Sequence, residues 1–249
     1  MKIEFFCAAL MTAALLSSCK NEESTRCFAS FPPEADPVMI GNKIANRFLE
    51  QGHSQYGSPL RVNEPRTQIT YPDVCTWLGA LWFAKETDNK ELTNRLIARF
   101  EPLFTNESYL LPKPNHVDNN VFGAVPLELY LQTGDERYKT MGMKYADTQW
   151  QLPDNWQIKE GETRRSALYG DFVDADICQP EQKEWADKGY SWQTRFWLDD
   201  MYMITTIQSQ AYRVSNDMKY IDRAASEMVL YLDSIQQPSG LFYHAPTAP

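Results

Sequence analysis

Three stretches of the chain share one layout: "LGALWFAKETDNKELTNRLIARF" (residues 78–100), "VPLELYLQTGDERYKTMGMKYAD" (125–147) and "ITTIQSQAYRVSNDMKYIDRAAS" (204–226). In each stretch an apolar segment leads into a short polar turn, and a second segment with one apolar face follows. The turns contain Gly, Asn and Asp, which adopt the backbone conformations that tight turns need. Each stretch therefore predicts an αα-hairpin.

The two helices of each predicted hairpin differ in polarity. The first is apolar nearly all round, as in "TWLGALWFA" (76–84), whereas the second carries charge on one side, as in "KELTNRLIARFE" (90–101). Helices that are apolar all round lie inside a protein, and repeated hairpins bury their apolar faces against one another. We therefore predict an all-α fold with inner and outer helix layers, as in an α/α toroid. We expect Leu92, Tyr138 and Tyr220 to lie on the buried sides of the second helices.

Composition narrows the class of protein. The chain has 249 residues, 43% apolar and 23% charged, with a formal net charge of −9. These proportions are ordinary for a globular domain with a hydrophobic core. Nucleic-acid binding is not expected, because it needs clustered Lys and Arg.

The N-terminus "MKIEFFCAALMTAALLSSC" (1–19) has an early Lys, an apolar run and small residues before Cys19. This pattern is typical of an export signal, and "LSSC" resembles a lipobox. We expect a lipoprotein signal peptide over 1–18, lipidation of Cys19, a tether over 19–36 and a catalytic domain over 37–249. An ordinary secretory signal is the alternative. The lipid would be the only membrane contact. We expect the protein at the outer membrane or cell surface, and a location on the periplasmic side is the alternative.

Two acidic residues carry the candidate chemistry: Asp118 in "NHVDNNVFGA" (115–124) and Asp199 in "RFWLDDMYM" (195–203). Both precede or open inner helices, which run in one direction in a toroid, so the two carboxylates should lie at the same end. Paired carboxylates suit acid–base attack at a sugar, because burial or mutual repulsion keeps one of them protonated. The alternative is that both are helix caps. We expect Asp200 to be a helix-start residue.

Aromatic and histidine side chains are candidates for binding a sugar. Trp77, Trp192 and Trp197 are possible stacking platforms, although core packing is the alternative for each. His244 in "LFYHAPTAP" (241–249) lies outside the repeat and is a candidate cleft donor. The three cysteines that follow Cys19 make no zinc pattern, so no metal site is expected.

Three segments, "HVDNNVFGAVPLELYLQTGDERY" (116–138), "FWLDDMYM" (196–203) and "GLFYHAP" (240–246), resemble glycoside hydrolase family 105 and, more distantly, family 88. The resemblance covers approximately residues 37–249. It implies an (α/α)6 barrel that removes 4,5-unsaturated uronic acid from the non-reducing end of lyase-generated oligosaccharides. The implied reaction hydrates the vinyl ether and needs no metal or organic cofactor.

The resemblance also implies roles for individual residues. Its W-x-D-x-x-x-M pattern falls on Trp197, Asp199 and Met203, which makes Asp199 the proton donor and water activator and Trp197 a wall of the site. Asp118 is the carboxylate partner, and His244 lines the substrate site. Many members carry a histidine shortly upstream of this pattern, and here either Gln193 or Arg195 fills that space. Arg195 is a candidate uronate partner, and Asn119 is a further substrate-binding candidate.

Such enzymes normally continue with a W-G-R-G-N-G-W-like segment and further helices. About seven helices can be placed here, fewer than a complete toroid has. We therefore expect this chain to be the N-terminal part of the barrel, with weak or no activity by itself. The target polysaccharide stays open between pectic, ulvan and glycosaminoglycan products. Two alternatives are an inverting glycosidase acting on saturated glycans and a non-catalytic surface glycan-binding lipoprotein.

Overall fold

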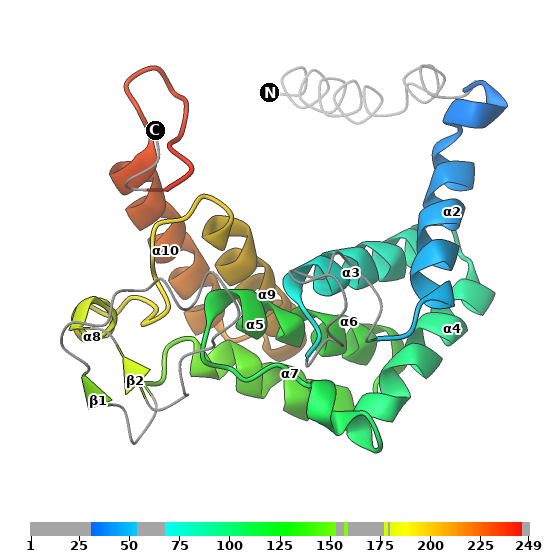
Figure 1. Cartoon of the computed structure of the whole chain (residues 1–249), viewed down its shortest axis with the longest axis horizontal. Helices are drawn as coiled ribbons and strands as arrows, with labels where there is room; N and C mark the ends of the chain where they lie inside the picture. Colours follow the sequence, from blue (N-terminus) through cyan, green and yellow to red (C-terminus); the bar gives the residue numbers. More distant parts are fainter. Residues whose placement is uncertain (1–30, 54–67, 153–156, 159–176, 179, 246–249) are drawn as a thin grey trace, which may run out of the picture. The chain divides into compact units, whose positions relative to one another are not determined.

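The computed structural model describes all residues except 1–30, 54–67, 153–156, 159–176, 179 and 246–249 (Figure 1). The chain divides into two compact units, residues 1–44 and 45–249. The predicted signal peptide, the predicted lipidation site Cys19 and most of the predicted tether lie outside the described residues. None of the helices in the described ranges has the length and apolar character needed to cross a membrane.

The first unit contains the 3₁₀ helix η2 (Pro33–Ala35) and the beginning of helix α2 (Pro37–Glu50), whose end belongs to the second unit. The second unit holds the remaining elements of the described chain. Its hairpin helices are α3 (Tyr71–Glu86), α4 (Lys90–Phe100), α6 (Ala124–Thr133), α7 (Glu136–Thr148), α9 (Asp200–Ser215) and α10 (Met218–Ile235). The other elements are η3 (Glu101–Phe104), η4 (Ser108–Leu110), α5 (Val117–Asn120), η5 (Val121–Gly123), β1 (Gln157–Ile158), β2 (Ile177–Cys178) and α8 (Pro180–Asp187).

The three predicted hairpins are present as α3/α4, α6/α7 and α9/α10 (Figure 1). The second helix of each hairpin begins after a polar side chain that caps it. The carboxamide of Asn89 accepts a hydrogen bond from Leu92 N at 3.0 Å, and Asp135 and Asp217 cap α7 and α10 in the same way. Capping satisfies backbone N–H groups that have no partner within the helix. The turn residues seen in the sequence therefore mark the helix boundaries.

The helices form two layers within the second unit. The first helices pack side by side, α3 against α6 and α6 against α9, and each second helix packs on its own first helix. Leu92, Tyr138 and Tyr220 are all buried, as predicted for the inner side of the second helices. The two described strands are only two residues long and pair in parallel. The all-α prediction with inner and outer helices is confirmed.

Two acidic residues, the buried Glu128 and the partly exposed Asp147, connect the helices. Glu128 on α6 accepts hydrogen bonds from Trp82 on α3 and from Gln210 and Arg213 on α9, at 2.8 to 3.0 Å. Burial alone would raise the pKa of Glu128, but these contacts, together with a hydrogen bond from Gln132, lower it. Its carboxylate therefore joins all three first helices.

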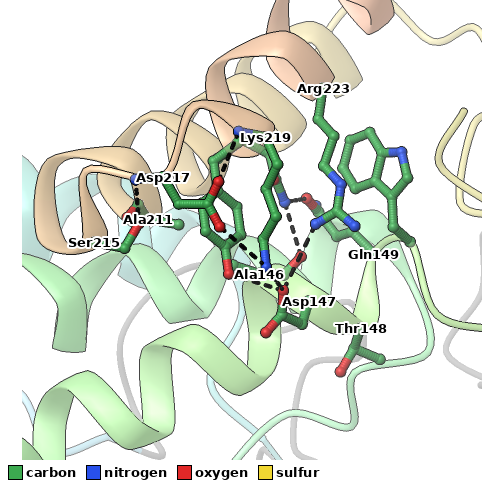
Figure 2. A network of polar contacts seen from close by, with 12 residues as sticks. Ala146, Asp147, Thr148, Gln149, Ala211, Ser215, Asp217, Lys219 and Arg223 are labelled. Atoms are coloured by element: carbon green, nitrogen blue, oxygen red, sulfur yellow. Dashed lines mark hydrogen bonds and ion pairs between the residues drawn. The ribbon is translucent and has the colours of Figure 1, made fainter.

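The second acidic residue, Asp147 on α7, joins α7 to α10 (Figure 2). Its carboxylate accepts a hydrogen bond from the Tyr220 hydroxyl at 2.9 Å and lies 3.8 Å from Lys219 and 3.6 Å from Arg223. Next to Asp147, the side-chain amide of Gln208 on α9 donates a hydrogen bond to Ala146 O at 2.8 Å. These contacts fix the second hairpin against the third.

Candidate active site

Asp118 and Asp199 lie together although 81 positions separate them in the sequence. Asp118 is on α5, which leads through η5 into the first helix of the second hairpin, and Asp199 immediately precedes α9. One carboxylate oxygen from each of Asp118, Asp199 and Asp200 lies within 4.8 Å of the other two. The arrangement of the first helices thus brings both acidic motifs to one end, as the sequence indicated.

Arg195 is the cation of this cluster. Its Nη2 lies 2.7 Å from Asp118 Oδ1, its Nε lies 2.8 Å from Asp200 Oδ1, and its Nη1 lies 3.1 Å from His116 Nε2. The guanidinium also lies over the Trp197 ring, 5.0 Å from the ring centroid. Three carboxylates would be a possible donor set for a divalent cation. Arg195 already pairs with two of them, so the group fits an ion-paired cluster better than a metal site.

Asp200, the first residue of α9, is the fully buried member of the cluster. Its Oδ2 accepts hydrogen bonds from the Tyr231 hydroxyl at 3.0 Å and from Trp197 N at 3.2 Å. Burial raises the pKa of Asp200 to about 7, against the opposing charge of Arg195. The expectation of a helix-start residue is confirmed, and its carboxylate also orients Arg195.

The helix-cap alternative does not describe Asp118 or Asp199. The side chain of Asp199 makes no capping hydrogen bond, and its buried Oδ1 has no hydrogen-bond partner among the described residues. Helix α5 is capped by His116, whose Nδ1 accepts from Asp118 N at 3.2 Å. Burial raises the pKa of Asp118, the charge of Arg195 opposes this, and the charge of Asp199 adds to it. One carboxyl is thus held by Arg195, and the other keeps an oxygen available.

Two tyrosines that the sequence analysis missed lie at the starts of first helices, and the first of them is near the carboxylates. Tyr71 opens α3, and its pKa is raised by burial and then by the charges of Asp118 and Asp199. Tyr202 is on the first turn of α9, where burial and the Cys75 thiol raise its pKa to about 12. Both side chains are about two-fifths exposed. The available signal was their position at the starts of first helices, the same end at which the acidic residues were predicted.

Trp197 and His244 lie next to each other, as expected for two residues at one site. Their ring centroids are 5.4 Å apart, and Leu198 N donates to His244 O at 2.9 Å. The backbone bridge between Gln236 and Phe242 turns the chain back after α10, which brings His244 to this position. The roles of both residues in substrate binding stay predictions.

Three of the candidate substrate contacts are buried in the structure. Trp77 is fully buried, packs against Phe48 and Phe100, and donates its indole N–H to Leu96 O at 3.3 Å. Trp192 is 2% exposed and donates to Thr148 O at 2.6 Å. Neither ring has a face left for a sugar.

Asn119 is the third of these candidates and is 3% exposed. Its Nδ2 donates to Asn115 Oδ1 at 3.1 Å, and its Oδ1 accepts from Gln68 at 3.0 Å. Both ends of the amide therefore bind the protein itself.

All three guanidinium nitrogen atoms of Arg195 also contact protein groups. The predicted contact between Arg195 and a uronate would therefore have to use the Nη1 proton that remains.

Comparison with protein families gives a match. The model of Glycosyl Hydrolase Family 88 matches residues 40–248, a range that includes Asp118, Arg195 and Asp199. A comparison with curated proteins gave no match, and a comparison with solved structures gave none either. Because the family model covers most of the sequence, the chain belongs to glycosyl hydrolase family 88.

Proposed function

We propose that this protein is an unsaturated uronyl hydrolase of the rhamnogalacturonyl (family 105) type. It would remove 4,5-unsaturated uronic acid from the non-reducing end of oligosaccharides that a polysaccharide lyase has produced. The observation that carries the proposal is the buried Oδ1 of Asp199, which has no hydrogen-bond partner in the described part of the chain, beside the Arg195-bound Asp118. Family membership supports the class of reaction.

Asp199 carries the proton transfers in this proposal. Its protonated carboxyl donates to C4 of the vinyl ether, and positive charge develops at C5. Water then adds to C5 and returns one proton to the Asp199 carboxylate. The resulting hemiketal opens and releases the next sugar, so the acid is regenerated in each turnover.

The charge of the cluster supports a proton on one of its carboxyls. Three carboxylates and one guanidinium would carry a formal charge of −2 if all were ionised. A uronate substrate adds a further negative charge, which favours proton uptake by the nearest acid. Burial already raises the pKa of Asp118 and of Asp200. Substrate binding should therefore favour the protonated cluster that the first step needs.

The experiment follows the ultraviolet absorbance of the unsaturated uronate when purified protein is mixed with lyase-generated disaccharides. Pectic, ulvan and glycosaminoglycan products are tested separately, and loss of absorbance is expected for at least one. Asp199→Asn should lower kcat by about 10² to 10⁴, the usual loss on removing a general acid–base. Asp222→Asn, at an exposed position on α10, is the control and should keep full activity. Unchanged absorbance with all three products would refute the proposal.

The carboxylate spacing argues against an inverting glycosidase. Inverting enzymes leave about 6.5 to 9.5 Å between their carboxyl groups to admit a water molecule. Here one oxygen from each of the three carboxyl groups lies within 4.8 Å of the other two. An inverting enzyme would leave the absorbance unchanged and release reducing ends from saturated chains, which the same incubations detect. A purely glycan-binding protein would show affinity for the products without turnover of any of them.

A further inference from the structure

Helix α10 belongs to the outer layer, yet two of its buried side chains bind the segment that carries Arg195. Glu227 and Tyr231 lie one helical turn apart, so they share one face of α10. They are 1% and 0% exposed. Glu227 accepts hydrogen bonds from Ser191 N at 3.2 Å and from the Thr194 hydroxyl. The segment is therefore attached to α10 just before Arg195.

The Tyr231 hydroxyl makes the second attachment, directly at the cluster. It donates to Asp200 Oδ2 at 3.0 Å and lies 3.3 Å from both Arg195 N and Phe196 N, which donate to it. A hydroxyl has one proton to donate and two lone pairs to accept with, and all three are used here. Burial raises the pKa of Tyr231 well above its usual range, so the hydroxyl keeps its proton.

The backbone at Phe196 shows why this attachment is needed. Its φ is +62°, a left-handed conformation that is costly for a bulky side chain and persists only where its surroundings enforce it. The Phe196 ring packs 5.1 Å from Tyr231 and, edge-on, 5.1 Å from Trp185. Tyr231 therefore holds the strained turn through its ring and through its hydroxyl.

We infer that Tyr231 is a positioning residue for the reaction, acting through Asp200 and Arg195 to hold the Asp118 carboxyl in place. The contacts run without a break from Tyr231 to Asp200, from Asp200 to Arg195 and from Arg195 to Asp118. Because Tyr231 is fully buried, it does not touch the substrate. The inference rests on the proposed function for its kinetic consequences, and on the structure alone for its effect on the cluster.

The test compares Tyr231→Phe with Tyr220→Phe. Both tyrosines are buried on α10, and both hydroxyls donate to an aspartate, but Tyr220 binds Asp147, outside the cluster. Each variant loses the same atom from the same helix. Tyr231→Phe should lower kcat by about 10- to 100-fold with KM changed less than about threefold, because misplacement of catalytic groups acts mainly on the chemical step. Tyr220→Phe should retain the wild-type kcat.

A second measurement does not depend on activity. Loss of the Tyr231 hydrogen bond removes a group that stabilises the ionised Asp200, so the Asp200 pKa should rise above its value of about 7. Carboxyl titration by isotope-edited infrared or ¹³C NMR spectroscopy, assigned with Asp200→Asn, measures that pKa in both tyrosine variants. If the wild type hydrolyses none of the substrates, the proposed function fails, and this titration still decides the role of Tyr231.

The inference is overturned if Tyr231→Phe matches Tyr220→Phe in kcat and in the Asp200 titration. Near-ultraviolet circular dichroism first establishes that each variant is folded. If Tyr231→Phe is not, Glu227→Gln replaces it, because Glu227 holds the same segment one turn earlier on α10. A folded Glu227→Gln with unchanged kcat would then count against an α10 attachment, and a lowered kcat at unchanged KM would support it.

Discussion

The Nη2 atom of Arg195 lies 2.7 Å from Oδ1 of Asp118, a residue 77 positions earlier in the chain. This contact joins the start of the second hairpin to the segment before the third. The same guanidinium binds Asp200, and the Arg195 side chain is only 10% exposed. Breaking a buried ion pair is costly because the remaining charge stays buried without its partner. Arg195 is therefore the residue on which the geometry of the acidic cluster depends.

Arg195→Lys should lower kcat by roughly 10- to 100-fold, because a single ammonium cannot reproduce the planar fork that reaches Asp118 and Asp200 together. The weaker pairing should also raise the Asp118 pKa further. Arg213→Lys is the matched control, since Arg213 pairs with buried Glu128 at 2.8 Å away from the cluster. The control should lose some stability and keep its kcat. Equal kcat values for the two variants would contradict the role given to Arg195.

Asp199→Asn should leave the free energy of unfolding unchanged or raise it by up to about 1 kcal/mol. Active-site groups held without partners are often destabilising, and an amide removes the charge at little steric cost. Asp200→Asn should instead lower the free energy of unfolding, because Asp200 binds Arg195 and Tyr231. Urea unfolding of both variants measures this difference. A loss in Asp199→Asn as large as that in Asp200→Asn would mean that Asp199 has a structural partner.

The hairpins and the meeting of Asp118 with Asp199 could be predicted because both depend on local pattern. Polar turn residues mark the helix ends, and first helices that run the same way place their N-terminal residues together. The burial of Trp77 and Trp192 could not be predicted, because it depends on which face of each segment meets its neighbours. The role of Tyr231 could not be predicted for the same reason, because in the sequence Tyr231 is one of several apolar positions of an outer helix.

The free energy of unfolding of Glu227→Gln, measured relative to that of the wild type, should increase as the pH rises. Burial raises the pKa of Glu227 to about 7, with the Thr194 hydroxyl opposing, so the folded protein holds a proton that the unfolded chain releases at lower pH. Stability therefore falls as the pH rises from the unfolded value near 4.5 to about 7. A neutral amide lacks this dependence.

The effect of Glu227→Gln should reach on the order of 2 to 3 kcal/mol across that interval. Denaturant unfolding at several pH values between the two limits measures it. Asp222→Asn, at an exposed position on the same helix, controls for the loss of a carboxylate. A free-energy difference between Glu227→Gln and wild type that does not change with pH would show that Glu227 ionises normally in the fold.

Gly142→Ala tests the packing that sets the position of Asp118. A Cβ added at Gly142 would lie 2.8 Å from Gly123 O and 2.5 Å from Leu127 Cγ, so α7 and η5 meet at backbone distance there. Gly79, inside α3, has no atom within 4 Å of an added Cβ.

Both glycines lie in helix interiors, where alanine gains up to about 1 kcal/mol in helix propensity. Gly79→Ala should therefore stabilise the protein by roughly that amount, and Gly142→Ala should destabilise it by about 1 to 3 kcal/mol through overpacking. Since η5 continues directly from the helix that carries Asp118, Gly142→Ala should also lower kcat. Equal unfolding midpoints for Gly142→Ala and Gly79→Ala would contradict the packing argument, because they would show that α7 and η5 can separate at no cost.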